Sequence, residues 1–387
     1  MLTIRLPIAN GVLQDYRLTG APIPVRRPSA PFNRIALAAA HIVVKPLGNA
    51  DPSGPPDIDW GPTIAFRQHL LDLGLGVAEA MDTAQRGMGL TWDGAHELIR
   101  RSLAATAGRK DAVIYSGVGT DHLTSNDACS VDDVARAYLL QLHAVQRLGG
   151  RVILMASRAL VRVAKSPADY AKVYAAVLSE AQHPVILHWL GEMFDPALAG
   201  YWGGTDFRDT METCLGVIAA NARKVEGIKI SLLDADKEII MRSRLPKGVR
   251  MYTGDDFNYP ELIKGDGQGH SEALLGIFDA IAPAASAGLA ALAAGETAAY
   301  HKLLDPTVPL SRLIFRAPTR YYKTGIVFLA WLNGHQEHFI MAGGQQAMRP
   351  ISYFAEAFRL ADRAGLLRDP DLATRRMRAL LAIYGVS

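Results

Sequence analysis

Short apolar segments alternate with longer segments of helical spacing along most of this chain of 387 residues, and the alternation constrains the fold more than any other feature. The first of these segments, residues 35–44, is an apolar run of the kind that is typical of a strand buried on both faces. These segments are 35–44, 76–81, 111–115, 151–155, 184–188, 227–230 and 249–252. The intervening segments 63–73, 91–107, 131–148, 166–180 and 205–222 have helical spacing, and Thr91 is a suitable N-cap for the second of them.

Strand–helix units repeated in this way fit either a closed parallel barrel or an open doubly wound sheet. No G-x-G-x-x-G follows the first apolar segment, which disfavours the dinucleotide-binding form of the open sheet. We therefore predict a (β/α)8 TIM barrel over residues 35–285. Residues 1–34 are expected to form an N-terminal extension, a hairpin laid over one end of the main fold. An eighth turn near Gly269 and His270 is expected to lead into additional C-terminal helices, which dominate residues 286–387.

Charge and cysteine content exclude several classes of partner. The 41 basic and 38 acidic residues nearly cancel, and no segment combines clustered Lys and Arg with aromatic residues, so a nucleic-acid partner is not expected. No run of about 18 apolar residues occurs, so we expect no contact with a membrane. Cys129 and Cys214 lie far apart without metal-ligand spacing, which favours a reducing compartment and a cytoplasmic protein.

Polar residues follow the predicted strands. In a parallel barrel the carboxyl ends of the strands converge on one mouth, where catalytic residues lie. The residues at or just past these ends include His41, Asp82, Thr83, 116–122, Arg158, His188, Lys229, 253–256 and His270.

Lys229 lies within the apolar, β-branched segment 225–231. Burial there disfavours the ammonium and leaves a neutral amine that can attack a carbonyl. The structural alternative is a lysine at a strand edge that reaches solvent or pairs with an acid such as Asp234. His188 ends its strand and can move protons near neutral pH, or it can be a satisfied structural histidine.

A metal site is a second interpretation of the same strand ends. Imidazole and carboxylate groups at a barrel mouth can hold a divalent ion, although their wide separation in sequence makes the signal unspecific. The candidate ligands are His41, His188, Glu192, Asp255, Asp256 and His270.

Several short motifs occur in the same order as in a known group of enzymes. They are 90–91 (Leu-Thr), 116–119 (Ser-Gly-Val-Gly), 184–188 (Pro-Val-Ile-Leu-His), 227–229 (Gly-Ile-Lys), 252–256 (Tyr-Thr-Gly-Asp-Asp) and 349–350 (Arg-Pro). Over most of residues 35–368 the chain thus resembles the dihydrodipicolinate synthase and N-acetylneuraminate lyase superfamily of class I aldolases. Its first loop and its N-terminal extension exceed the usual length in this family. The chain therefore resembles a divergent, dihydrodipicolinate synthase-like branch.

The resemblance implies that Lys229 forms the Schiff base and that Thr83 belongs to a proton relay. Three positions depart from the family pattern. Ala84 stands where the family has a threonine that holds the pyruvate carboxylate, Asp82 stands where it has glycine, and His188 stands where it has a catalytic tyrosine. An added carboxylate repels a keto acid unless Arg86 or Arg158 compensates, so a hydroxyl-rich ketone is expected instead of pyruvate.

We therefore expect a Schiff-base-forming lyase that cleaves or dehydrates a keto-sugar or related polyol ketone without a cofactor. The expected catalytic residues are Lys229, His188 and Thr83; the expected substrate-binding residues are Asp82, Arg86, His41, Arg158, Asp255, Asp256 and His270. The alternatives are a metal-dependent sugar isomerase or epimerase and a non-catalytic sugar-binding barrel. The resemblance also implies a homodimer or homotetramer.

Overall fold

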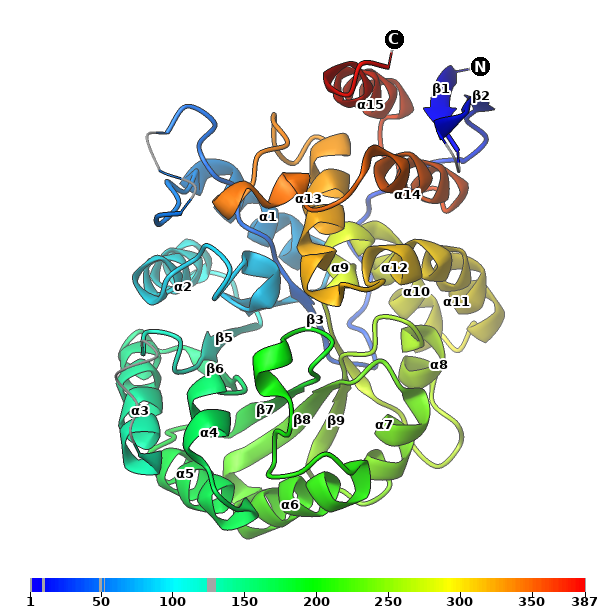
Figure 1. Ribbon diagram of the computed structural model, residues 1–387. Coiled ribbons are helices and arrows are strands. Elements are labelled where there is room, and N and C mark those ends of the chain that lie inside the picture. Colours follow the sequence, from blue (N-terminus) through cyan, green and yellow to red (C-terminus); the bar gives the residue numbers. More distant parts are fainter. Residues whose placement is uncertain (1, 9–10, 49–50, 52, 124–129, 387) are drawn as a thin grey trace.

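Eight parallel strands close into a barrel in the computed structural model, which describes residues 2–8, 11–48, 51, 53–123 and 130–386. The order around the barrel is β10-β3-β4-β5-β6-β7-β8-β9, so the predicted (β/α)8 fold is confirmed (Figure 1). The strands are β3 (Ala36–Ala39), β4 (Gly76–Glu79), β5 (Ile114–Val118), β6 (Arg151–Leu154), β7 (Val185–Leu190), β8 (Val225–Ser231), β9 (Arg250–Thr253) and β10 (Glu272–Leu275).

Helices follow the strands and surround the barrel (Figure 1). They are α1 (Trp60–Asp72), α2 (Trp92–Thr106), α3 (Val131–Arg147), α4 (Arg158–Val163), α5 (Pro167–Ser179), α6 (Phe207–Ala220), α7 (Ala235–Arg242), α8 (Tyr259–Lys264) and α9 (Ile277–Ala280). The predicted N-cap of α2 is confirmed, because the Thr91 side chain accepts a hydrogen bond from the backbone of Gly94.

The first strand is shorter than its apolar segment. Residues 35–44 were expected to form one strand, but β3 ends at Ala39. Beyond it, the backbone N–H of His41 donates to Asp279 and that of Val43 donates to Thr63, at 2.8 and 3.0 Å. Side-chain oxygens thus accept the backbone N–H groups that would otherwise bond to a neighbouring strand. The expected turn at Gly269 and His270 precedes a short eighth strand, β10, which closes the barrel against β3.

The C-terminal third is helical, as expected. Its elements are α10 (Ala282–Ala293), α11 (Thr297–Leu304), α12 (Val308–Ile314), α13 (Tyr322–Leu332), α14 (Ile351–Arg363) and α15 (Pro370–Ile383). A division at 285/286 falls inside α10, so no break in secondary structure marks the predicted start of this region.

The expected N-terminal hairpin is present as the antiparallel pair β1 (Thr3–Pro7) and β2 (Leu13–Arg17). The hairpin packs beside α14 and α15, with both chain termini nearby (Figure 1), and the Tyr16 hydroxyl donates to Asp362 at 2.8 Å. Apolar side chains of the hairpin are buried in the same hydrophobic cluster as those of α14, which favours this position.

The amino-terminal end of the barrel is closed by a buried polar cluster. Glu226 accepts hydrogen bonds from Tyr115 and Tyr252, at 2.6 and 3.0 Å, and from Arg151 at 3.1 Å. Apolar side chains, including Ile153, fill the barrel interior around these tyrosines. The barrel interior is therefore packed at its amino-terminal end.

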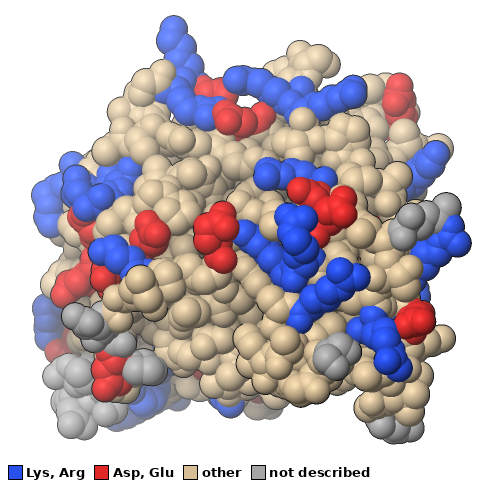
Figure 2. All heavy atoms as spheres, turned by 90° about the horizontal axis from the view of Figure 1, so that it is seen from above, with Lys and Arg blue, Asp and Glu red and all other residues tan. Residues whose placement is uncertain are grey.

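The surface carries charges of both signs. Figure 2 shows basic and acidic side chains close to one another over the face seen from above, consistent with the near balance of 41 and 38 residues. Among the described residues, no helix combines the length and the apolar character needed to span a membrane. Cys214 is a free, buried thiol in α6, whereas Cys129 lies outside the described residues.

Candidate active site

A cavity of about 200 Å3 opens at the carboxyl ends of the strands. Its lining includes His188 and Leu190 from β7, Asp82 from the loop after β4, and Arg158 from the start of α4. The volume corresponds to roughly seven water molecules at about 30 Å3 each, which suits a small organic ligand. This position is the one at which barrel enzymes bind their substrates.

Lys229 points into the barrel next to this cavity. Its neighbours in the strand register are His188 on β7 and Tyr252 on β9, and the latter belongs to the interior cluster. The residue is 7% exposed, and among the described residues no hydrogen bond or ion pair involves its amine. Burial lowers the pKa of the Lys229 amine, and the carboxylates of Asp82 and Asp256 partly oppose this shift.

Lys229 neither reaches solvent from a strand edge nor pairs with Asp234, so the structural alternative for this residue is wrong. Asp234, the acid suggested as its partner, lies at the N-cap of α7 and pairs with Lys237 at 3.2 Å. Lys229 is instead accommodated inside the barrel by Gly254, because a Cβ there would lie 2.7 Å from the Lys229 Cε atom. The glycine of the 252–256 segment therefore makes space for the lysine on the neighbouring strand.

His188 is fully buried and lies beside Lys229. One ring nitrogen, Nε2, is 3.2 Å from the Ser231 hydroxyl, and the other, Nδ1, has no partner among the described residues. Burial, and then the charge of Lys229, lowers the pKa of His188 well below its usual value. The imidazole is thus neutral at pH 7 and has a nitrogen free to exchange a proton.

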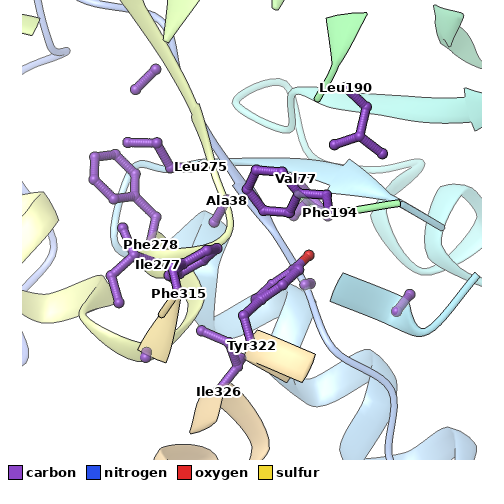
Figure 3. Packing of buried hydrophobic residues seen from close by; sticks show 14 of the residues in the cluster. Ala38, Val77, Leu190, Phe194, Leu275, Ile277, Phe278, Phe315, Tyr322 and Ile326 are labelled. Carbon is purple, nitrogen blue, oxygen red and sulfur yellow. The ribbon is translucent and has the colours of Figure 1, made fainter. Parts of the chain in front are cut away.

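Thr83 lies in the short 3-10 turn η2 (Asp82–Ala84) and is hydrogen bonded to a tyrosine from the C-terminal helices. The distance between Thr83 Oγ1 and the Tyr322 hydroxyl is 2.8 Å. Figure 3 shows the Tyr322 ring among Phe194 and Phe315. The next residue, Lys323, is also buried, and burial lowers its pKa to about 8.

The three predicted acids differ in their surroundings. Asp82 lines the cavity and has no ion pair among the described residues. Asp256 accepts a hydrogen bond from the backbone of Ile277 at 2.9 Å, and burial raises its pKa to about 7. Asp255 accepts the backbone N–H groups of Phe257 and Asn258, as expected for a carboxylate that stabilises a turn. Asp82 and Asp256 are therefore the acids that face Lys229.

Arg86 and Arg158 both line the cavity but are paired within the protein. Arg86 makes a bidentate pair with Asp121, at 2.9 and 2.7 Å, and also donates to the backbone of Gly117 and to Gln141. Its donors are therefore occupied in bracing the loops after β4 and β5. Arg158 pairs with Asp195 through Nε alone and remains half-exposed at the rim.

Neither of the other two predicted histidines lines the cavity. His41 follows β3 as expected, but its Nδ1 lies 2.7 Å from Asp279 and its ring packs against Phe66 in the protein interior. The expectation that His270 lies at the mouth is wrong, because it precedes β10 and therefore lies at the amino-terminal end of the barrel. There it is exposed and lies 3.7 Å from Glu272.

The ligand set of the metal hypothesis is not assembled. Among the described residues, no three His, Cys, Asp or Glu side chains come together as a metal site requires. Glu192 is exposed, and His41 and His270 lie away from the cavity.

The sequence analysis did not identify Tyr322, Lys323 or Ser231 as site residues. Thr83 and Tyr322 are 239 positions apart, and no motif links them. Ser231 is the exception, because it follows Lys229 by two residues on the same strand and therefore points to the same side.

Comparison with known proteins identifies the family and supports the fold. A family model described as "Protein of unknown function (DUF993)" matches residues 4–386. Among curated proteins, none matches the sequence.

Solved structures of the dihydrodipicolinate synthase group are similar to this one. The enzyme from Acinetobacter baumannii, complexed with pyruvate, has a TM-score of 0.63 at 16% identity, over 86% of this chain and 99% of that chain. YagE from E. coli K12, also in complex with pyruvate, has a TM-score of 0.62 at 13% identity, over 92% and 99%. Dihydrodipicolinate synthase from Bacillus anthracis has a TM-score of 0.57 at 17% identity, over 77% and 88%. The predicted resemblance is thereby confirmed at the level of the fold.

Proposed function

The chain belongs to the family described as protein of unknown function (DUF993), and we propose that it is a Schiff-base-forming lyase that acts on a small carbonyl compound. The observation that carries the proposal is the amine of Lys229. It is buried, free of ion pairs among the described residues, held at a lowered pKa, and adjacent to a cavity of suitable size. A neutral amine in such a position can attack a carbonyl carbon.

The reaction uses the imine as an electron sink. Lys229 adds to the carbonyl and water leaves. The protonated imine then accepts the electrons of a neighbouring C–C bond in retro-aldol cleavage. In dehydration it accepts the electrons of the adjacent C–H bond as the proton is removed, and the resulting enamine expels the hydroxyl of the next carbon as water. Positive charge develops on the lysine nitrogen, where the carboxylates of Asp82 and Asp256 stabilise it. His188, neutral and with an unpartnered Nδ1, accepts the proton released when the bond breaks.

The substrate is a hydroxyl-rich ketone such as a keto-sugar. Asp82 supplies acceptors for hydroxyl groups at the cavity wall, and a carboxylate in that position repels a keto acid. Ala84 has no hydroxyl with which to hold a substrate carboxylate. Pyruvate, which is present in two of the similar structures, therefore fits this site less well than a ketose does.

Reductive trapping tests the proposal. The protein is incubated with cyanoborohydride and D-fructose, dihydroxyacetone or pyruvate, and the modified peptide is identified by mass spectrometry. We expect an adduct on Lys229 that forms faster with the ketoses than with pyruvate, and none at this position in Lys229→Met. Lys237→Met removes an exposed, ion-paired lysine and keeps full labelling of Lys229. Wild-type protein that forms no Lys229 adduct with any of these compounds would contradict the imine mechanism, and faster labelling by pyruvate would contradict the substrate class.

A further inference from the structure

The cavity at the carboxyl ends of the strands is lined by charges of both signs. Its charged lining residues are Asp82, Arg86, Asp121, Arg158, Arg162 and Asp195. Two of these arginines pair with two of the aspartates, which leaves Asp82 and Arg162 without an ion pair among the described residues. Asp82 is half-buried in the loop after β4, whereas Arg162 is exposed on α4, which follows β6. The cavity therefore has an unpaired negative charge inside and an unpaired positive charge at its rim.

We infer that Arg162 and Arg158 bind an anionic group, a phosphate ester or a carboxylate, at the end of the keto-sugar that is remote from its carbonyl. The inference rests on the proposed function and deepens it, because it narrows the substrate class from ketoses in general to ketoses that carry a negative charge. It also assigns a role to Arg162, which the sequence analysis did not identify as a site residue.

The two arginines face the cavity from one side of the same helix. They are four residues apart on α4, a spacing that places both side chains on one helix face, and both line the cavity. Arg162 makes no hydrogen bond to another described residue, so the five N–H donors of its guanidinium group are available to a ligand. Guanidinium groups bind phosphate and carboxylate oxygens through pairs of parallel hydrogen bonds.

The Arg158 side chain is held in place while its outer donors stay available. Its Nε donates to Asp195, and among the described residues Nη1 and Nη2 donate to none. Gly87 lies against this end of the guanidinium group, because a Cβ there would lie 3.1 Å from Nη1 and 3.4 Å from Nη2. A glycine thus makes room for the arginine at the cavity wall. A guanidinium group that is already oriented loses little conformational freedom when it binds an anion.

The place of the anion within the substrate follows from the two unpaired charges. A carboxylate bonded directly to the carbonyl carbon, as in pyruvate, would come close to Asp82 when the carbonyl meets Lys229, and the two negative charges repel. An anion several carbons away can lie against Arg158 and Arg162 while the hydroxyl groups between contact Asp82. Opposite charges at the two places also determine which end of the substrate enters first.

Reductive trapping with D-fructose, D-fructose 6-phosphate and 5-keto-D-gluconate tests the inference. The readout is the rate of Lys229 labelling by each anionic ketose divided by the rate with D-fructose. Comparing this ratio between wild type and Arg162→Met cancels the different open-chain contents of the sugars. We expect the ratio to fall roughly 3- to 10-fold in Arg162→Met, because a charge-assisted contact at a solvent-exposed rim is lost. Added NaCl should lower the wild-type ratio, because salt screens such contacts.

Asp195→Asn is predicted to change the ratio in the opposite direction. The carboxylate of Asp195 competes with a bound anion for Arg158, and its Oδ1 accepts the backbone N–H of Ala197 at 3.1 Å. Asparagine keeps an oxygen for that hydrogen bond and removes the charge, so the ratio should rise several-fold. Arg147→Met is the matched control, because Arg147 is an exposed arginine in the last turn of α3, which leads into the amino-terminal end of β6. It changes the net charge equally and should keep the wild-type ratio.

The outcomes distinguish this inference from the proposed function. If wild-type protein forms no adduct on Lys229 with any of the three compounds, the imine mechanism itself fails. If Lys229 is labelled but the ratios for both anionic ketoses are equal in wild type and Arg162→Met, or fall equally in Arg147→Met, the anion site is overturned and the imine stands. A fall for only one of the two compounds supports the site and identifies its ligand as a phosphate ester or as a carboxylate.

Discussion

The protonation state of Lys229 depends on two opposing effects within a few side chains. Removal from water favours the neutral amine, whereas the carboxylates of Asp82 and Asp256 favour the ammonium. Burial has the larger effect, so the pKa of the amine is lowered. Before the imine forms, the carboxylates favour the protonated amine. Once it has formed, they stabilise the positive charge of the protonated imine.

Removing one of these carboxylates is predicted to shift the pH dependence of labelling. In Asp256→Asn the amine loses an anion that favours its protonated form, so the pKa of Lys229 falls further. Neutral amine then becomes available at lower pH. We expect the midpoint of the labelling rate against pH to move to lower pH, by on the order of one unit.

The control for this shift is Asp234→Asn, which alters an acid that pairs with Lys237 at the start of α7. Its midpoint should equal that of wild type. A midpoint that moves to higher pH in Asp256→Asn would show that Asp256 does not act on Lys229 as an anion.

At the scale of elements, β8 and β9 fit together through a glycine. A Cβ on Gly254 would lie 2.3 Å from the Ser231 hydroxyl, 2.6 Å from the Ile230 carbonyl oxygen and 2.7 Å from Lys229 Cε. All three distances are shorter than normal contacts, and one of the atoms is backbone, so the strands themselves must adjust to any larger residue.

Gly254→Ala is therefore predicted to displace Lys229 and to lower stability. We expect a loss of about 1–3 kcal/mol in the free energy of unfolding, the usual cost of overpacking a core. Labelling of Lys229 should slow by roughly tenfold or more, because small displacements of a reacting group are costly. Urea denaturation and the trapping assay measure the two effects.

Gly216→Ala is the matched control, because it lies in α6 and a Cβ there meets nothing within 4 Å. Alanine in a helix interior is expected to stabilise the protein by roughly 0.5–1 kcal/mol without altering labelling. A Gly254→Ala protein as stable and as reactive as wild type would refute the close fit of β8 and β9.

The elements that the sequence predicted well are those with a strong local pattern. The segment around Lys229 is apolar and β-branched, and its strand and inward lysine were both predictable. The eighth strand, Glu-Ala-Leu-Leu, has no β-branched residue and is only four residues long, so the pattern showed a turn but not the strand. His270 was misplaced for this reason, since a turn before a strand and a turn after it look alike in sequence.

Contacts between distant segments were not predictable. The Thr83–Tyr322 pair is formed only because α13 packs against η2, and helical spacing does not specify which helix a turn will meet. Asp255 was ambiguous for a local reason, because its sequence context is compatible with both turn formation and substrate binding. In the structure its hydrogen bonds stabilise the turn.

At the scale of the whole molecule, the C-terminal helices connect the N-terminal hairpin to the active site. α13 contacts η2, α14 contacts β1, and α13 and α14 contact each other. The attachment of the hairpin depends on Asp362, a buried acid that accepts from the Tyr16 hydroxyl at 2.8 Å and from the backbone of Thr19 and Gly20 at 2.9 and 3.2 Å. At the active-site end of these helices, Tyr322 is hydrogen bonded to Thr83.

Replacing Asp362 is predicted to loosen the hairpin without affecting the site. Asp362→Ala leaves a buried hydroxyl and two backbone N–H groups without their acceptor, at an expected cost of about 1–3 kcal/mol. Amide hydrogen exchange should become faster in residues 13–20, whereas the rate of Lys229 labelling should stay at the wild-type value. Asp15→Ala, which removes an exposed pair with Arg5 on the same hairpin, should change stability by less than about 0.5 kcal/mol. Slower labelling in Asp362→Ala would instead show that the hairpin contributes to holding α13 against Thr83. No described residue of the hairpin lines the cavity, so such an effect has to pass through the helices.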